Sequence, residues 1–339
     1  MKHKNSTHPA PYPERCCTLL PCTVPAPSHT PVLLHEVLTL LSPKPGEHYA
    51  DCTAGLGGHA CVIARPLQAG RVTLMDADPA NLERAAANVR AAAPAVSVAT
   101  HHANFAHAPR LLAATPADMI LADLGFSSNQ MDDPARGFSF RHDAPLDMRL
   151  DPTLPTTAAD LVASLPEREL AKLIVEFGED RAAPRIAREV CRARRATPIT
   201  TTTQLADIIR SVVPKGDSPI DPATRTFQAL RIAVNDELGV LQALLDAVRR
   251  AADAIEAGKP AWLNPGARVA VISFHSLEDR AVKQVFGDIL RRSRATGRNS
   301  AQELSCQPTV PTENEVAANP RARSAKLRVV RLSLEKTAP

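Results

Sequence analysis

The residues best placed to do chemistry are a glycine-rich turn and the acidic residues around it. The segment Asp51-Cys52-Thr53-Ala54-Gly55-Leu56-Gly57-Gly58-His59 closes a short apolar stretch, and Met75-Asp76-Ala77-Asp78 closes the next one. Glycine lets the backbone turn sharply and approach a ligand closely. An acidic side chain at the end of the second strand accepts hydrogen bonds from two ribose hydroxyls. The pattern predicts the front half of an α/β unit that binds a ligand built on adenosine.

The composition of this turn separates the possible ligands. Neither Ala60 nor Cys61 supplies the third glycine of the dinucleotide fingerprint, and no Gly-Lys-Ser/Thr of a P-loop follows the turn. Asp51, ahead of the glycines, would repel a pyrophosphate but suits the cationic amino-acid end of S-adenosylmethionine. The residues therefore favour S-adenosylmethionine, and they leave NAD and a turn that only shapes the fold as alternatives.

Composition excludes several other classes of protein. The chain has 339 residues, of which 44% are hydrophobic and 3% aromatic, so it can bury one large core or two ordinary ones built mainly from aliphatic side chains. No apolar run approaches the roughly 18 residues that span a bilayer, and prolines interrupt the region where a secretory signal would lie. The seven cysteines form no paired C-x-x-C signature. We expect a cytoplasmic protein with reduced thiols, no membrane segment and no bound metal.

Apolar patterns predict a sheet whose sequence is interrupted by a helical segment. Residues 1–28 are rich in proline and show no periodicity, so we expect a disordered extension. Strand and helix patterns then alternate, which favours a parallel sheet. Strands are predicted at His48–Thr53, Arg71–Met75, Val96–His101, Met119–Ala122, Arg268–Ser273 and Lys326–Leu334; helices are predicted from Pro31, at Gly58–Leu67 and at Pro79–Ala92.

The remaining segments define the domain organisation that we expect. Residues 131–222 have helical or irregular patterns only, and the polar stretch Arg294–Pro320 is predicted to be a long loop. The predicted fold is α/β, with one discontinuous domain made of residues 29–130 and 223–339. An all-helical domain, residues 131–222, is inserted into it.

Three acidic residues, Asp51, Asp76 and Asp123, end predicted strands. Because ligands bind outside the carboxyl ends of the strands in an open α/β sheet, we expect these side chains to line one crevice. Phe105, just past the third strand, is placed either to pack against an adenine or to belong to the core.

Further motifs follow in order over residues 29–331. In chain order they are His29-Thr30-Pro31-Val32-Leu33-Leu34, the Gly-Gly-His turn, Asp123-Leu124-Gly125, Arg136-Gly137-Phe138-Ser139-Phe140, Pro145-Leu146-Asp147-Met148-Arg149, Ala223-Thr224-Arg225-Thr226-Phe227-Gln228-Ala229, Ser273-Phe274-His275-Ser276-Leu277-Glu278-Asp279-Arg280 and Asn319-Pro320-Arg321-Ala322-Arg323-Ser324. With these motifs the chain resembles the family of methyltransferases H of small-subunit ribosomal RNA, also called MraW. It departs from the family pattern at Phe126 and Asn129, which replace a small aliphatic residue and a proline.

The resemblance implies a fold, an activity and a partner. The fold is a class I, Rossmann-like methyltransferase domain with a helical insert. The activity is S-adenosylmethionine-dependent methylation of N4 of a cytidine in the P-site region of 16S rRNA, and the partner is the small ribosomal subunit. The family's cofactor contacts carry over to Gly57, Gly58, His59, Asp76, Phe105, Asp123 and Gln130.

The chemistry of the acceptor defines what the site must supply. The lone pair of a cytosine amine is delocalised into the ring, so the site must accept hydrogen bonds from the amine, align it with the sulfonium methyl and remove a proton late. Asp123, or an oxygen of Ser127 or Ser128, is the candidate acceptor. The mechanism requires no cysteine nucleophile.

A basic helix is the candidate RNA contact. Arg185, Arg188, Arg192 and Arg195 fall on one face of a helix that follows Pro184. This face is either a phosphate-binding stripe or a solvated surface, and the RNA substrate of the family favours the stripe. Arg225 is a candidate contact to the base or its phosphate, with capping and packing as equal alternatives.

The spacing of Ser276 and Asp279 predicts a capping box at the start of the helix that follows the fifth strand. This makes His275 a residue of turn geometry rather than an acid or base. Two other functions stay open: a dehydrogenase on the same fold, and a non-enzymatic RNA or assembly factor that keeps the cofactor fold. Monomer and dimer are both compatible with the sequence.

Overall fold

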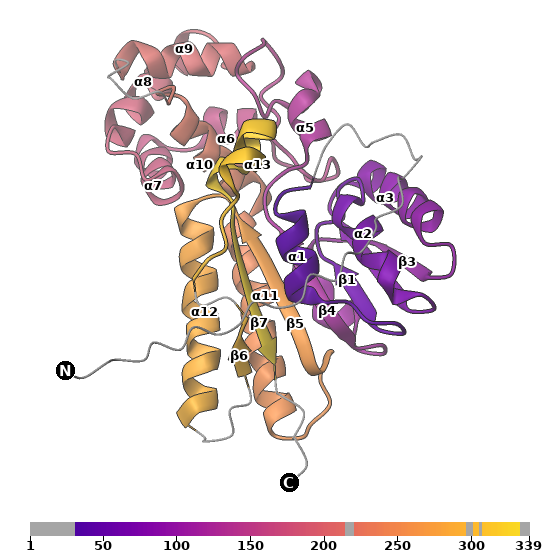
Figure 1. Cartoon of the computed structure of the whole chain (residues 1–339). Helices are drawn as coiled ribbons and strands as arrows, with labels where there is room; N and C mark the ends of the chain where they lie inside the picture. The colour runs from indigo at the N-terminus through magenta and orange to yellow at the C-terminus, as the bar shows by residue number, and fades with distance from the viewer. Residues whose placement is uncertain (1–30, 214–219, 296–300, 305–306, 333–339) are drawn as a thin grey trace, which may run out of the picture.

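The computed structural model describes residues 31–213, 220–295, 301–304 and 307–332 (Figure 1). The extension expected at residues 1–28 lies outside these residues. Within the described part, no helix is both long and apolar enough to cross a bilayer.

A seven-stranded sheet with the order β3-β2-β1-β4-β5-β7-β6 forms the centre of the α/β part. Strands β1 to β5 run parallel to one another, and β7 pairs antiparallel with both β5 and β6. The strands are β1 (His48–Asp51), β2 (Arg71–Asp76), β3 (Ser97–His102), β4 (Ala117–Asp123), β5 (Leu263–Ser273), β6 (Ala301–Glu303) and β7 (Lys326–Leu332). The order reverses direction between β1 and β4, which is where doubly wound sheets bind ligands. The predicted α/β class is confirmed.

Helices cover both faces of the sheet (Figure 1). On one face lie α1 (Leu34–Leu41), α2 (Gly58–Leu67) and α3 (Pro79–Ala92), and on the other lie η1 (Phe105–His107), α4 (Ala108–Leu111), α11 (Glu237–Glu256) and α12 (Ser276–Ala295). Strand β4 shows the cause: Met119 and Leu121 pack with α1–α3, whereas Ile120 and Ala122 pack with α11 and α12. Successive side chains of a strand point to opposite faces, so a strand buried on both faces is apolar throughout.

A second, helical part has its own core. It contains α5 (Ser128–Asp132), η2 (Pro134–Arg136), α6 (Ala158–Ser164), α7 (Glu167–Gly178), α8 (Ala183–Ala196), α9 (Thr202–Val212) and α10 (Thr224–Asn235). The buried Leu170 and Ile174 of α7 pack here with Phe227 and Leu230 of α10. A side chain at Gly178 would lie 2.6 Å from the Arg225 carbonyl oxygen, which is why α7 and α10 approach closely only with glycine there. Helix α10, which the sequence assigns to the sheet domain, therefore packs into the helical core.

The long loop predicted at Arg294–Pro320 is wrong for the described residues. Helix α12 continues to Ala295, and β6, α13 (Glu313–Ala318) and η3 (Pro320–Ser324) follow. Thr312 caps α13 by accepting a hydrogen bond from the Glu315 N–H, and the Glu315 carboxylate accepts one from the Leu33 N–H at 2.7 Å. This short helix is held by capping and by a contact to the start of α1, and neither leaves an apolar periodicity in the sequence.

One buried guanidinium ties the sheet to α1. Arg268 on β5 is 4% exposed and donates to the Leu41 carbonyl oxygen at 2.8 Å. It also donates to both carboxylate oxygens of Glu47, at 2.8 and 2.6 Å. This arrangement satisfies the end of α1 and the turn before β1 with a single side chain.

Replacing Arg268 with methionine should therefore lower the free energy of unfolding by about 3 kcal/mol, because it leaves the Glu47 carboxylate partly buried without its counter-ion. Urea denaturation measures this change. A second substitution, Glu47→Gln, should recover part of the loss, since it removes the unpaired charge. Equal destabilisation of the single and double variants would contradict the ion-pair explanation.

Candidate active site

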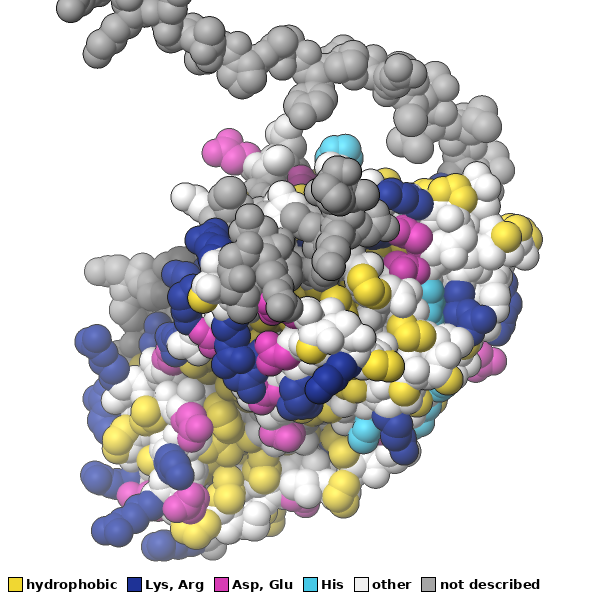
Figure 2. All heavy atoms as spheres, turned by 90° about the horizontal axis from the view of Figure 1, so that it is seen from below, with side chains coloured by type: hydrophobic (Ala, Val, Ile, Leu, Met, Phe, Trp, Pro, Cys, Tyr) yellow, Lys and Arg dark blue, Asp and Glu magenta, His cyan; other side chains and the backbone are white. Residues whose placement is uncertain are grey.

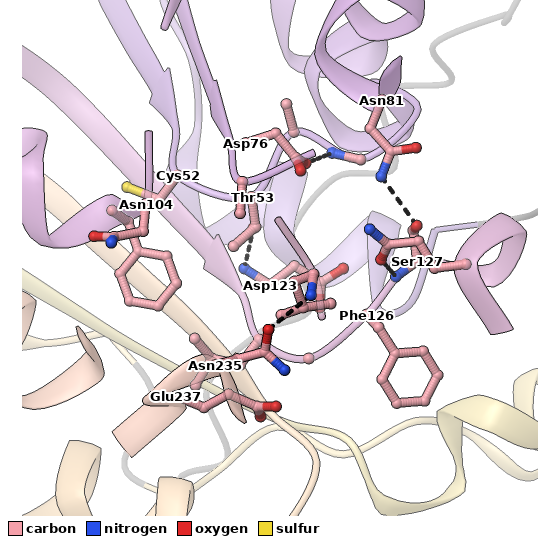
Figure 3. Close-up of a pocket in the computed structure, with 18 of the residues that line it drawn as sticks. Cys52, Thr53, Asp76, Asn81, Asn104, Asp123, Phe126, Ser127, Asn235 and Glu237 are labelled. Carbon is pink, nitrogen blue, oxygen red and sulfur yellow. Dashed lines mark hydrogen bonds between the residues drawn. The ribbon is translucent and has the colours of Figure 1, made fainter. Parts of the chain in front are cut away.

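A cleft opens at the carboxyl ends of β1, β2 and β4, between the sheet and the helical part (Figure 3). Asp123 lies in its middle. The lining of the cleft includes the glycine turn, Asp76, Asn104, Phe105 and Gln130, together with Phe126, Leu150, Asn235, Glu237, Phe274 and Glu278. Figure 3 shows Asp76 on one side of Asp123, and Asn235 and Glu237 on the other.

The glycine turn holds Asp76 in place. The carboxylate of Asp76 accepts hydrogen bonds from the N–H groups of Gly55, at 2.7 Å, and Asp78, at 2.8 Å. Burial raises the pKa of Asp76 to about 6. The side chain is thus fixed at the end of β2 before any ligand arrives, with lone pairs left to accept hydroxyl groups.

The two consecutive glycines have different surroundings. Gly58 lines the cleft, whereas Gly57 does not belong to its lining. Gly57 has φ +81°, and a Cβ there would lie 3.1 Å from the Ala85 backbone of α3. Gly57 is therefore required for the shape of the turn and its packing on α3.

Asp51 lies outside the crevice that the sequence predicts for it. Its carboxylate is 2% exposed and accepts hydrogen bonds from the Tyr49 hydroxyl at 2.9 Å and the Thr53 N–H at 3.1 Å. Residues two apart on a strand share a face, so the side chain of Asp51 turns back to Tyr49 instead of forward to the ligand. Burial raises the pKa of Asp51 to about 7.

Asp123 has the least satisfied carboxylate of the cleft. Its N–H donates to the Thr53 hydroxyl at 2.7 Å, but its Oδ1 is buried without a hydrogen-bond partner among the described residues. Its Oδ2 lies 3.7 Å from Nδ1 of His59, whose Nε2 contacts the Val32 carbonyl oxygen at 2.9 Å. Burial, together with the charges of Asp51 and Glu278, raises the pKa of Asp123 to about 8. A buried oxygen of this kind suits a ligand that brings a donor or a positive charge.

The loop after β4 is anchored on α3. The Ser127 N–H donates to Oε1 of Gln130 at 3.0 Å, and the Gln130 amide donates to Asp78 at 3.1 Å. The Ser127 hydroxyl accepts a hydrogen bond from Asn81 at 3.2 Å and lines the cleft, while the side chain of Ser128 lies outside the described residues. Asn129 donates to Asn81 at 2.8 Å, so the loop is held there without the proline usual in the family.

Several lining residues do not follow from sequence reasoning. Asn235 accepts a hydrogen bond from the Leu150 N–H at 2.7 Å and donates to the Met148 carbonyl oxygen at 2.8 Å, so it holds the helical part over the cleft. Arg136 supports the same segment, since it pairs with Asp78 at 2.9 Å and donates to the Leu150 carbonyl oxygen at 2.7 Å. In the sequence, the polar run Asn235-Asp236-Glu237 between two apolar helix patterns was the one signal that could have indicated these residues.

The capping box predicted from Ser276 and Asp279 is wrong. Glu278 caps the start of α12 by accepting hydrogen bonds from the N–H groups of Phe274, at 2.8 Å, and His275, at 3.2 Å. Asp279 instead binds Arg328 at 2.8 Å and Lys326 at 3.2 Å on the antiparallel strand β7. Spacing along the sequence does not reveal that Arg328 and Lys326, which are distant along the chain, bind Asp279. The prediction therefore missed that the preceding carboxylate, Glu278, is the cap.

The four arginines of α8, Arg185, Arg188, Arg192 and Arg195, are all exposed. Their nearest acidic partners are also on the surface: Glu167 lies 3.8 Å from Arg188, and Glu189 pairs with Arg192. Arg225 is exposed on α10 and donates to the Glu179 carbonyl oxygen at 3.0 Å, outside the lining of the cleft. On the face seen in Figure 2, the Lys and Arg side chains are mixed with acidic and hydrophobic ones.

The three buried acids should make the stability of the ligand-free protein depend on pH. Asp51, Asp76 and Asp123 keep a proton up to pKa values of about 7, 6 and 8, whereas the unfolded chain loses each near its ordinary value of 3.8. The free energy of unfolding should therefore fall as the pH rises from about 4 to about 8. Asp123→Asn should flatten the upper part of this slope in urea denaturation. An unchanged slope would contradict the burial of an ionisable Asp123.

Known proteins are similar to this chain over most of its length. The model of the MraW methylase family matches residues 26–333. Ribosomal RNA small subunit methyltransferase H of Geobacter sulfurreducens is 46% identical over 316 residues, which cover 89% of this chain and 97% of that protein. Proteins of the same name from Heliobacterium modesticaldum and Granulibacter bethesdensis are each 43% identical, covering 88% and 92% of this chain and 97% and 93% of theirs.

The cleft fits the cofactor of such an enzyme, S-adenosylmethionine. The Asp76 carboxylate stands at the end of β2, the position from which sheets of this class bind a ribose. The glycine turn leaves room for a close approach of a ligand to the backbone, and the unpartnered oxygen of Asp123 suits a positive charge. The sheet with its helical insertion is the class I, Rossmann-like methyltransferase fold that the sequence predicts. The chain is a methyltransferase, and it belongs to the MraW methylase family.

Proposed function

We propose that this chain methylates N4 of a specific cytidine in the P-site region of 16S rRNA, within the small ribosomal subunit and in the cytoplasm. The names of its relatives support the substrate class. The observation that carries the chemistry is the buried, unpartnered oxygen of Asp123 in the middle of the cleft. S-adenosylmethionine, when bound, supplies the methyl group from its sulfonium.

The cleft residues divide into those that hold the cofactor and those that face the acceptor. Asp76 would accept the ribose hydroxyls, Phe105 would pack against the adenine, and Gly58, His59 and Gln130 complete that side, with Gly57 shaping the turn. Asp123 would accept a hydrogen bond from the amine and later its proton. Ser127 is the second candidate acceptor, but its hydroxyl already accepts a hydrogen bond from Asn81.

The helical part would bind RNA outside the cleft. Arg185, Arg188, Arg192 and Arg195 are exposed along α8 and are not tied into the core, so their guanidinium groups are available to phosphates. Arg225 donates to the carbonyl oxygen of Glu179, whose carboxylate accepts hydrogen bonds from Ser276 and Arg280 of α12. Because Arg225 lies outside the lining of the cleft, it would contact the RNA backbone rather than the base.

Asp123→Asn should lower the single-turnover rate of methyl transfer by about 100-fold, because the amide keeps the shape of the side chain but cannot take the proton. The affinity for RNA should not change, since Asp123 is not part of the basic surface. A variant with a near-normal single-turnover rate would leave Asp123 as a cofactor ligand only.

Replacing Arg185, Arg188 and Arg192 with alanine should weaken RNA binding and lower the slope of log K against log salt by about two to three, because fewer counter-ions are released. Cofactor affinity should stay the same. A matched control removes the same charge from α11 and α12 with Arg249→Ala, Arg291→Ala and Arg292→Ala, and should keep the slope. Equal slopes in both triple variants would show that the α8 arginines form a solvated surface and do not bind phosphates.

Transfer of a radiolabelled methyl group to intact small subunits, followed by nucleoside analysis, tests the proposal itself. The expected product is N4-methylcytidine at one position. Label in another nucleoside would overturn the proposed acceptor, and cofactor binding without any transfer would favour a non-enzymatic assembly factor.

A further inference from the structure

The half of the cleft beyond Asp123, away from Asp76, has no assigned role in cofactor binding (Figure 3). Figure 3 shows Phe126 from the loop after β4 there, with Asn235 and Glu237 from the junction of α10 and α11. A carboxylate oxygen of Glu278 lies within 4.8 Å of one of Glu237, and Phe274 lines the same cleft from the start of α12. We call these five residues the acceptor half. Two aromatic rings and two carboxylates suit a flat molecule with hydrogen-bond donors on one edge.

Hydrogen-bond acceptors dominate the charged groups of this region. Asp123, Asp151, Glu237 and Glu278 are acidic, and Arg321 is the one Lys or Arg among the described residues that line the cleft. The Asn235 amide donates its hydrogens to the carbonyl oxygens of Met148 and Arg231. An edge of a ligand that carries only hydrogen-bond acceptors would therefore find no free donor among these residues.

Glu237 is the carboxylate of this half that keeps acceptor positions for a ligand. Its two oxygens each accept one hydrogen bond from Arg231, at 2.8 Å, and the Arg231 guanidinium lies 4.9 Å from the centre of the Phe126 ring. Each oxygen keeps a further lone pair that a ligand can use. The Glu237 side chain is 10% exposed.

Glu278 is used differently. One of its oxygens accepts two backbone N–H groups at the start of α12, and the other faces His275 at 3.1 Å. The Glu278 N–H also donates to Nδ1 of His275 at 3.4 Å, so this residue is bound at both its backbone and its side chain to the start of α12. This carboxylate is therefore committed to capping the helix.

We propose that Glu237 binds the exocyclic amino group of the acceptor base and so selects cytosine over uracil; this rests on the proposed function. A cytosine amine has two hydrogens, of which one would go to Asp123 and the other to Glu237, leaving the nitrogen lone pair free for the methyl group. Uracil has a carbonyl oxygen at the same position. That oxygen would face two carboxylates without a donor, and so it is rejected.

Competition binding separates this role from a structural one. Small subunits are prepared with cytidine or with uridine at the nucleotide that the wild-type enzyme methylates. Each is bound in the presence of sinefungin, a cofactor analogue that carries a positive charge in place of the sulfonium and cannot transfer a methyl group, so that Asp123 has lost its proton. The wild-type enzyme should prefer cytidine by about 10- to 100-fold, the range for a lost hydrogen bond to a charged group. In Glu237→Gln the amide can donate to the uracil oxygen, so this preference should nearly vanish.

The controls cover folding and charge. Glu83→Gln, on the exposed surface of α3, makes the same chemical change and should keep the wild-type preference. If Glu237→Gln no longer binds the cofactor or shows no cooperative thermal unfolding, the experiment is repeated with Glu237→Asp. Its shorter carboxylate should lower the preference for cytidine over uridine at least about tenfold.

A Glu237 variant that weakens binding of both kinds of subunit equally, with the preference intact, would overturn the inference and leave Glu237 as the partner of Arg231. Failure of the proposed function would give a different result. The wild-type enzyme would then place no methyl group on an RNA amine, and no acceptor nucleotide would be mapped.

Discussion

The site depends on one electrostatic constraint: carboxyl groups are buried at the carboxyl ends of the central strands without a matching cation. Asp51 and Asp76 are satisfied by hydroxyl and N–H donors, but Oδ1 of Asp123 has no hydrogen-bond partner in the described structure. Burial of an acid without a cation favours its neutral form. Burying the charged form of Asp123 costs free energy in the empty cleft, and a ligand with a positive charge offsets that cost. This is a physical reason for the cleft to prefer a sulfonium over a neutral analogue.

The rest of the molecule gives that place its shape. The reversal of strand order between β1 and β4 opens the crevice, and Arg268 and Glu47 hold the sheet to α1 beneath it. Arg136 and Asn235 hold the segment around Leu150 over the cleft. The sheet and the helical part thus share one site: the sheet presents the acids, and the helical part closes the cleft and carries the exposed arginines.

Much of this follows from the sequence, and the exceptions have a common cause. The glycine turn and the acids at strand ends predict the sheet edge and the positions of Asp76 and Asp123, because period-two burial and turn chemistry are local. The long loop predicted at Arg294–Pro320 was wrong because the capping of α13 and its contact with Leu33 are not periodic signals. Asp51, Asn235 and Glu237 were misplaced or missed because their partners depend on tertiary contacts: Asp51 turns to Tyr49, Asn235 holds Leu150, and Glu237 pairs with Arg231.

Calorimetry of ligand binding in buffers of different ionisation enthalpy tests the central claim most directly. S-adenosylmethionine and S-adenosylhomocysteine share the adenosine and the amino-acid end, so the difference between them isolates the sulfonium charge. Because burial holds the pKa of Asp123 at about 8 in the ligand-free cleft, the cationic ligand should release more protons than the neutral one near pH 7, and its affinity should rise with pH up to about 8. Asp123→Asn should abolish the difference. Equal proton release by the two ligands in the wild-type protein would contradict the account.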